Sequence, residues 1–208
     1  MTSNRPYRSR LREEQAESTR RRIRASARRL FEGRGFERAT VADIAADAGV
    51  SPQTIYAVFG GKGGIVSSML DELEQSIGMD GWIGRMVNEP DPRRQLRLFV
   101  AFNRTMFEAG APILRAIVAG RGSPEVASIA ERGDEARRSG TAQLIAIVAS
   151  KGALRRGLDA DEAAERLWLL TSAEQFLHAT GRLGWQADRY ERWLGDLLER
   201  ELLEPVEA

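Results

Sequence analysis

Apolar residues recur at intervals of three and four along almost the whole chain, and this spacing constrains the fold most strongly. In residues 19–36, TRRRIRASARRLFEGRGF, one apolar stripe contains Ile23, Ala27, Leu30 and Phe31, and arginines occupy the other faces. A period near 3.6 residues is typical of amphipathic helices, whereas strands require strict alternation, which is rare here. The chain is therefore predicted to be all-α.

Two short helices are predicted within residues 39–59, ATVADIAADAGVSPQTIYAVF. Thr40 is suited to cap the first helix, and Asp43 three residues later completes a variant of the capping box. Gly49 can adopt the left-handed conformation that a sharp turn requires. The Ser-Pro pair that follows supplies a cap and a first residue for the second helix. Two short helices joined by a tight glycine turn predict a helix-turn-helix.

Lys62, one of only two lysines in the chain, lies in the segment FGGKGG at residues 59–64. Glycine-rich backbone around a lysine suggests a phosphate site. A nucleotide-binding loop is excluded, because Tyr56 stands where its first glycine belongs, Gly63 replaces its Ser or Thr, and a helix precedes the segment. The start of the next helix instead offers free N–H groups and a positive dipole to an anion. Lys62 is therefore predicted to contact a DNA phosphate.

The charge is divided unevenly along the chain. Residues 1–62 carry 13 Lys and Arg against 7 Asp and Glu, whereas residues 63–208 carry 18 against 23. A basic first part suits binding to a polyanion. Its N-terminal arginines form either a disordered arm or an arm that enters a minor groove; they are Arg5, Arg8, Arg10 and Arg12.

The rest of the chain is predicted to be helical between Gly and Pro breaks. A stretch punctuated by Gly and Pro covers residues 78–92. Helices are predicted over residues 65–77, 93–108, 112–119, 124–150, 159–181 and 186–203. Two domains follow: a helix-turn-helix DNA-binding domain with a basic arm at residues 1–64, and a larger helical domain for effector binding and dimerisation at residues 65–208.

The segment TVADIAADAGVSPQTIYAVFGGKGGIV, preceded by LFEGRGFERA, resembles the DNA-binding module of the TetR family of transcriptional regulators. The resemblance covers about residues 20–65. It implies that six residues contact base edges or phosphates: Thr40, Pro52, Gln53, Thr54, Tyr56 and Lys62. Independently, the amide of Gln53 can pair with adenine N6 and N7 in the major groove.

Two departures from the family pattern bear on this site. Val58 stands where the family usually has Tyr or His, so one phosphate contact is missing. Gly63 and Gly64 stand where an acid commonly follows the lysine. Because glycine weakens a helix, the loop is expected to be more mobile than is usual in the family.

The resemblance also implies a homodimer and a small apolar or amphipathic effector. A two-fold dimer reading palindromic half-sites adds the specificity that one half-site lacks. Dimer contacts are predicted at Leu167, Leu170, Leu177, His178, Tyr190, Trp193, Leu194 and Leu197. A ligand pocket is predicted at Trp82, Phe99, Phe102, Asn103, Met106, Trp168 and Gln175. For any one of these pocket residues, core packing is favoured over ligand binding. Asn103 and Gln175 are the informative ones, because a buried amide needs a hydrogen-bond partner, either within the chain or on a ligand.

We therefore expect a cytoplasmic transcriptional repressor that a small ligand releases from a palindromic DNA operator. The alternative is a DNA-binding regulator without an effector, either constitutive or architectural. No enzyme, cofactor or metal site is expected, because the chain has no cysteine and its single histidine, His178, lies away from any G-x-S-x-G elbow. A membrane role is disfavoured, since no apolar run approaches the roughly 18 residues of a membrane span.

Overall fold

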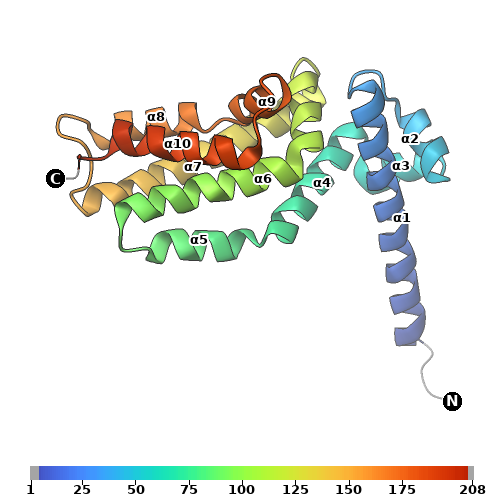
Figure 1. The fold of residues 1–208 in the computed structure, drawn as a ribbon. Coiled ribbons are helices and arrows are strands. Elements are labelled where there is room, and N and C mark those ends of the chain that lie inside the picture. Colours follow the sequence, from blue (N-terminus) through green and yellow to red (C-terminus); the bar gives the residue numbers. More distant parts are fainter. Residues whose placement is uncertain (1–4, 206–208) are drawn as a thin grey trace. The chain divides into compact units, whose positions relative to one another are not determined.

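The computed structural model describes residues 5–205, and the side chains from Arg10 onward. Within this range the chain is helical and forms no strand, which confirms the all-α prediction (Figure 1). The helices are α1 (Arg5–Arg34), α2 (Val41–Ala48), α3 (Pro52–Phe59), α4 (Lys62–Ile77), α5 (Met79–Asn88), α6 (Pro92–Gly120), α7 (Pro124–Ser150), α8 (Ala160–Leu170), α9 (Ala173–Gly181) and α10 (Ala187–Leu202).

The chain divides into two compact units that differ from the two predicted domains. The first unit contains the residues up to Asp71 together with Ala116–Ile129, and the second contains Glu72–Arg115 and the residues from Ala130 onward. The sequence had suggested one boundary, after residue 64. The α6–α7 segment joins the first unit because it is packed there: Val126 is fully buried, and Gly120 lies against the ring of Phe36.

The first unit is built on α1, whose buried face contains Ile23, Ala27 and Phe31. In Figure 1, α2 and α3 lie beside the C-terminal half of α1, and its N-terminal half extends past them. The backbone of residues 5–12 is thus helical and does not form a separate arm. Arginine and leucine, which are good helix formers, occur in this segment, and further along α1 Glu17 pairs with Arg24 at 2.8 Å.

The caps predicted for α2 and α3 are confirmed. The Thr40 hydroxyl accepts a hydrogen bond from the Asp43 N–H at 3.0 Å, and the Asp43 carboxylate accepts one from the Thr40 N–H at 3.0 Å. Ser51 accepts from the Thr54 N–H at 3.1 Å. Gly49 is left-handed, with a φ of 64°, at the turn between the two helices. These local contacts fix where each helix begins and ends.

Two predictions for the second unit are wrong. The stretch at residues 78–92 contains a helix, α5, and α6 continues without a break through Pro112. Gly110, which suggested a break, is a packing site: a Cβ atom there would lie 2.5 Å from the Cδ2 atom of Leu73. The apolar stripe of α6 from Leu96 to Ile117 maintains the helix despite the hydrogen bond that Pro112 cannot donate.

The helix predicted over residues 159–181 is divided into α8 and α9. Ser172 begins α9, and its hydroxyl accepts a hydrogen bond from the Gln175 N–H at 3.3 Å. The hydroxyl of the buried Thr171 donates back to the Leu167 carbonyl at 2.6 Å and ends α8. Thr171 therefore ends one helix and Ser172 begins the next. The apolar spacing of the sequence continues across this pair, so it did not indicate the break.

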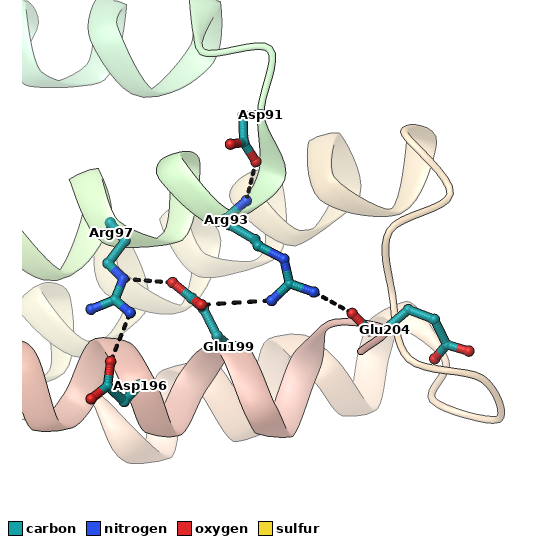
Figure 2. Close-up of polar contacts among 6 residues, drawn as sticks. All are labelled: Asp91, Arg93, Arg97, Asp196, Glu199 and Glu204. Carbon is teal, nitrogen blue, oxygen red and sulfur yellow. Dashed lines mark hydrogen bonds and ion pairs between the residues drawn. The ribbon is translucent and has the colours of Figure 1, made fainter. Parts of the chain in front are cut away.

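Ion pairs between α6 and α10 join two helices of the second unit that also share its apolar core. The Arg97 guanidinium group lies 2.5 Å from a carboxylate oxygen of Glu199 and 2.7 Å from one of Asp196 (Figure 2). The hydrogen bond to Glu199, followed by the one to Asp196, raises the pKa of Arg97. Gly195 makes room for this arrangement, because a Cβ atom there would lie 2.8 Å from a terminal nitrogen of Arg97. The buried Leu194 and Leu198 lie beside the ion pairs on α10.

Within the described residues, no helix is long and apolar enough to cross a membrane.

Candidate nucleic-acid interface

The exposed face of α3 carries three of the six residues predicted to contact DNA. Pro52, Gln53 and Tyr56 are exposed, and Tyr56 retains 56% of its accessible surface. On the opposite face, Ile55 is completely buried. This single anchor faces the core of the module, so the polar and aromatic side chains on the other side of the short helix remain accessible.

Two predicted phosphate contacts have hydroxyl groups that already serve the caps. The Thr40 hydroxyl donates to the Asp43 carboxylate at 2.6 Å, and the Thr54 hydroxyl shares a hydrogen bond with the Ser51 hydroxyl at 3.0 Å. Thr40 is exposed and Thr54 is half-buried. A hydroxyl group has one donor and two acceptor sites, so these two side chains are held in fixed positions at the ends of the helices.

Lys62 is half-buried and begins α4. Its ammonium group donates a hydrogen bond to the Phe36 carbonyl at 3.0 Å and lies 4.3 Å from the centre of the Phe36 ring. An ammonium group has three N–H donors, so this bond leaves donors for a second acceptor. Lys62 thus ties the start of α4 to the segment between α1 and α2, a structural role that the sequence did not reveal.

Acidic side chains on α2 are paired with arginines of α1. Arg29 pairs with Asp47 at 2.6 Å and Arg34 with Asp43 at 3.7 Å. The Thr40 hydroxyl, together with the Thr40 N–H, lowers the pKa of Asp43. A hydrogen bond from Ser26, followed by one from Arg29, lowers the pKa of Asp47. Both carboxylates are thus engaged within the module.

The exposed charge of α1 consists largely of arginines that have no place in the family pattern. Arg10 and Arg12 are exposed on its N-terminal half, and the side chains of Arg5 and Arg8 lie outside the described residues. Further exposed arginines follow on the same helix: Arg20, Arg21, Arg22 and Arg28. A basic helix beside the helix-turn-helix suits contact with a phosphate backbone.

The predicted ligand-pocket residues do not form one group. Phe99, Phe102, Met106 and Trp82 pack in or against the core of the second unit, and the rings of Trp82 and Phe102 lie 6.0 Å apart. Trp168 lies away from that core, with Arg137 and Arg138 each 4.5 Å from its ring centre.

The side-chain amides of Asn103 and Gln175, which were expected to need a partner if buried, have hydrogen-bond partners within the chain. The buried Asn103 donates to the Phe99 carbonyl at 2.8 Å, and Gln175 donates to the Leu169 carbonyl at 3.3 Å. Each amide nitrogen therefore donates one hydrogen bond within the chain. A surface hollow of about 560 Å³ lies elsewhere, at the end of α10, and contains no predicted pocket residue; its lining is Arg93, Arg155, Asp196, Glu199, Arg200, Glu201, Leu203 and Pro205.

Three of the predicted dimer contacts are core residues instead. Leu167, Tyr190 and Leu194 are at most 1% exposed within a single chain, so they have no surface left for a partner. Leu170, Leu177 and Leu197 are half-buried against the same core. Only His178 and Trp193 of the predicted set are exposed. Two leucines that the prediction omitted, Leu169 and Leu183, are exposed by 62% and 58%.

Part of the chain has recognisable relatives. Residues 23–69 match the family model described as bacterial regulatory proteins, tetR family. The HTH-type transcriptional regulator TtgR of Pseudomonas putida is 36% identical over 98 residues, which are 46% of this chain and 47% of TtgR. The matched segment thus spans about half the length of that relative.

Solved structures show the same fold over most of the chain. NalD, the secondary repressor of the MexAB-OprM multidrug efflux pump in Pseudomonas aeruginosa, has a TM-score of 0.75 and 23% identity, and the match covers 93% of this chain and 100% of NalD. A protein from Saccharomonospora viridis in complex with choline has a TM-score of 0.67 and 25% identity, over 89% of this chain and 98% of that one.

Proposed function

We propose that this chain, a member of the TetR family of bacterial regulatory proteins through its residues 23–69, represses transcription by binding a specific operator with α3. The observation that carries the proposal is the exposed face of α3. Pro52, Gln53 and Tyr56 lie there, and Ile55 anchors the helix from behind. A helix of this kind enters the major groove, where an amide side chain reads base edges.

Phosphate contacts orient α3 on the duplex. Lys62 supplies its remaining N–H donors at one end of the module, and Thr40 and Thr54 lie at the starts of α2 and α3. Contacts of this kind fix the register and carry little sequence information. Sequence preference therefore depends mainly on Gln53, with Tyr56 and Pro52 shaping the surface beside it.

Two copies of the chain bind one palindromic operator. The exposed Leu169, Leu183, Trp193 and His178 supply an apolar face around α8, α9 and α10 for the second copy. A closed two-fold dimer uses the same patch on both subunits. The helical second unit then binds a small apolar or amphipathic effector, and the solved relative from Saccharomonospora viridis holds choline.

Effector binding lowers operator affinity by favouring a state that fits DNA poorly. Only a difference in effector affinity between the two states produces such a shift. A 100-fold loss of operator affinity corresponds to about 2.7 kcal/mol of coupling, which is within the range found for allosteric proteins.

Selection of bound duplexes from a random pool tests the proposal. The full chain is expected to enrich a palindrome whose half-sites are about one helical turn or more apart. The matched control is a variant with both Gln53→Ala and Tyr56→Ala, which should enrich no defined sequence. If the unaltered protein recovers only unrelated duplexes at every ionic strength tested, the chain is not a sequence-specific regulator.

A further inference from the structure

The first turn of α4 contains two consecutive glycines, which are unusual at the start of a stable helix. Gly63 and Gly64 follow Lys62, and this turn contains no acidic residue. Gly61 precedes the helix with a φ of 146°, and it has no side chain to serve as a cap. Glycine is a poor helix former, so a reason for this composition must be sought in the surroundings of the turn.

On one side, the turn lies directly against the end of α3. A Cβ atom on Gly64 would lie 1.7 Å from the carbonyl oxygen of Phe59 and 2.8 Å from its carbonyl carbon. Phe59 is the last residue of α3. The backbone of that helix therefore fills the space that any other residue at position 64 would need.

On the other side, the turn lies against the first turn of α7. A Cβ atom on Gly63 would lie 3.2 Å from the Cβ atom of Glu125 and 3.4 Å from its carbonyl oxygen. A Cβ atom on Gly61 would lie 3.9 and 4.0 Å from the two carboxylate oxygens of Glu125. The start of α4 is thus packed between the end of α3 and the start of α7.

The turn makes a third contact, through Lys62. The Lys62 ammonium group is bonded to the Phe36 carbonyl. The Phe36 ring in turn lies 2.7 Å from where a Cβ atom on Gly120 would be, and that position is also 3.1 Å from Val126. Because close-packed atoms resist compression, a displacement of α7 is expected to be passed to α3.

We propose that the Gly63–Gly64 turn mechanically couples α7 to the recognition helix α3, with Glu125 as the positioning residue on α7. The inference rests on the proposed function only in naming α3 as the helix that reads DNA. Glu125 belongs to the first unit, and α7 continues from it into the second unit, which contains the part of the helix from Ala130 to Ser150. Any effector-driven movement of α7 therefore reaches α3 through backbone contacts at two glycines.

A reversible cross-link tests this coupling without DNA or effector. The chain has no cysteine, so Gly63→Cys combined with Glu125→Cys provides one unique pair. The 3.2 Å separation needs only a few tenths of an ångström to reach the Cβ spacing of a disulfide, about 3.5–4.5 Å. Hydrogen–deuterium exchange is then compared between the oxidised and reduced forms of this variant, with each single cysteine variant as a control.

Oxidation is expected to slow amide exchange within α3 by at least about five-fold, although the cross-link lies outside that helix. Slowing confined to the residues flanking the two cysteines would overturn the coupling. Failure of the folded double variant to oxidise would overturn the contact itself. Because this measurement involves no duplex, it remains decisive even if the chain proves not to bind DNA.

A second set of variants keeps the proposal testable if the cysteine pair fails to fold. Gly63→Ala is expected to weaken binding to the duplex selected with the unaltered protein by about ten-fold, through overpacking against Glu125. Adding Glu125→Gly should restore most of the loss, whereas Glu125→Ala retains the Cβ atom and should not. Equal behaviour of the two double variants would contradict the contact.

Discussion

At the scale of single residues, backbone conformation and close packing explain why glycines predominate in the FGGKGG segment. Gly60 has a φ of 75° and ends α3, whereas Gly63 and Gly64 provide space for neighbouring backbone. The sequence indicated that these glycines would loosen the loop. The structure gives a different reason for them, because close packing on both sides of α4 excludes a side chain.

Gly64→Ala is expected to destabilise the protein by at least about 1–3 kcal/mol, the usual cost of overpacking. The added Cβ atom would meet the Phe59 carbonyl oxygen, which cannot move without moving α3. Urea unfolding measures the change. Gly33→Ala, at an exposed helical position with no neighbour within 4 Å, is the control and should instead stabilise α1 by up to about 1 kcal/mol. Equal effects at both positions would contradict the packing.

Lys62→Ala is expected to weaken binding to operator and random duplexes alike. Loss of one phosphate contact should reduce the slope of log affinity against log salt by about one unit. The lost hydrogen bond to Phe36 should lower the free energy of unfolding by about 0.5–1.5 kcal/mol. Lys151→Ala removes the only other lysine, in the second unit, and should leave the slope unchanged. An unchanged slope in the Lys62 variant would remove that residue from the DNA interface.

At the scale of helices, prediction succeeded where the determinants are local. Thr40, Asp43 and Ser51 cap α2 and α3 through contacts within four residues, so the sequence contains the whole signal. Prediction failed for α5 and α6, because Gly110 and Pro112 look like breaks unless the packing against Leu73 is known. Likewise, no local pattern shows that Lys62 bonds to Phe36, 26 residues earlier.

The capping box of α2 predicts a pH dependence of stability. The Thr40 hydroxyl, the largest cause, lowers the pKa of Asp43 below its ordinary value of 3.8. A carboxylate with a lowered folded-state pKa stabilises the fold above its unfolded pKa, and this contribution is lost as the pH falls through the folded value. Asp43→Asn and Thr40→Ala should each reduce the fall in stability below about pH 4, measured by urea unfolding at a series of pH values. An unaltered acid profile in both variants would contradict the capping box.

At the scale of the whole molecule, burial within one chain decides which predicted contacts remain available. Tyr190 illustrates the difficulty: the apolar stripe of α10 includes it, yet it is buried and its pKa is raised to about 12 by that burial. An amphipathic stripe does not reveal whether its partner is the same chain or a second copy. The exposed leucines on α8 and after α9 became visible only once the fold was known.

Leu169→Glu is expected to weaken self-association at least about ten-fold, because a carboxylate would be buried in the proposed apolar face. Sedimentation velocity measures the shift toward monomer, and affinity for the full palindrome should fall toward that for one half-site. Ile83→Glu replaces another exposed apolar residue, on α5, and should leave the dimer intact. A Leu169 variant that remains dimeric would place the interface elsewhere.

The most direct test of α3 as the reading element is the base preference of Gln53→Ala. Affinities for the selected operator, for all its single-base variants and for random duplex are measured at one salt concentration. We predict that Gln53→Ala costs about 1–3 kcal/mol on the best site and abolishes discrimination at one position of each half-site, with random duplex unaffected. Equal losses on operator and random DNA, with every base preference retained, would contradict the account.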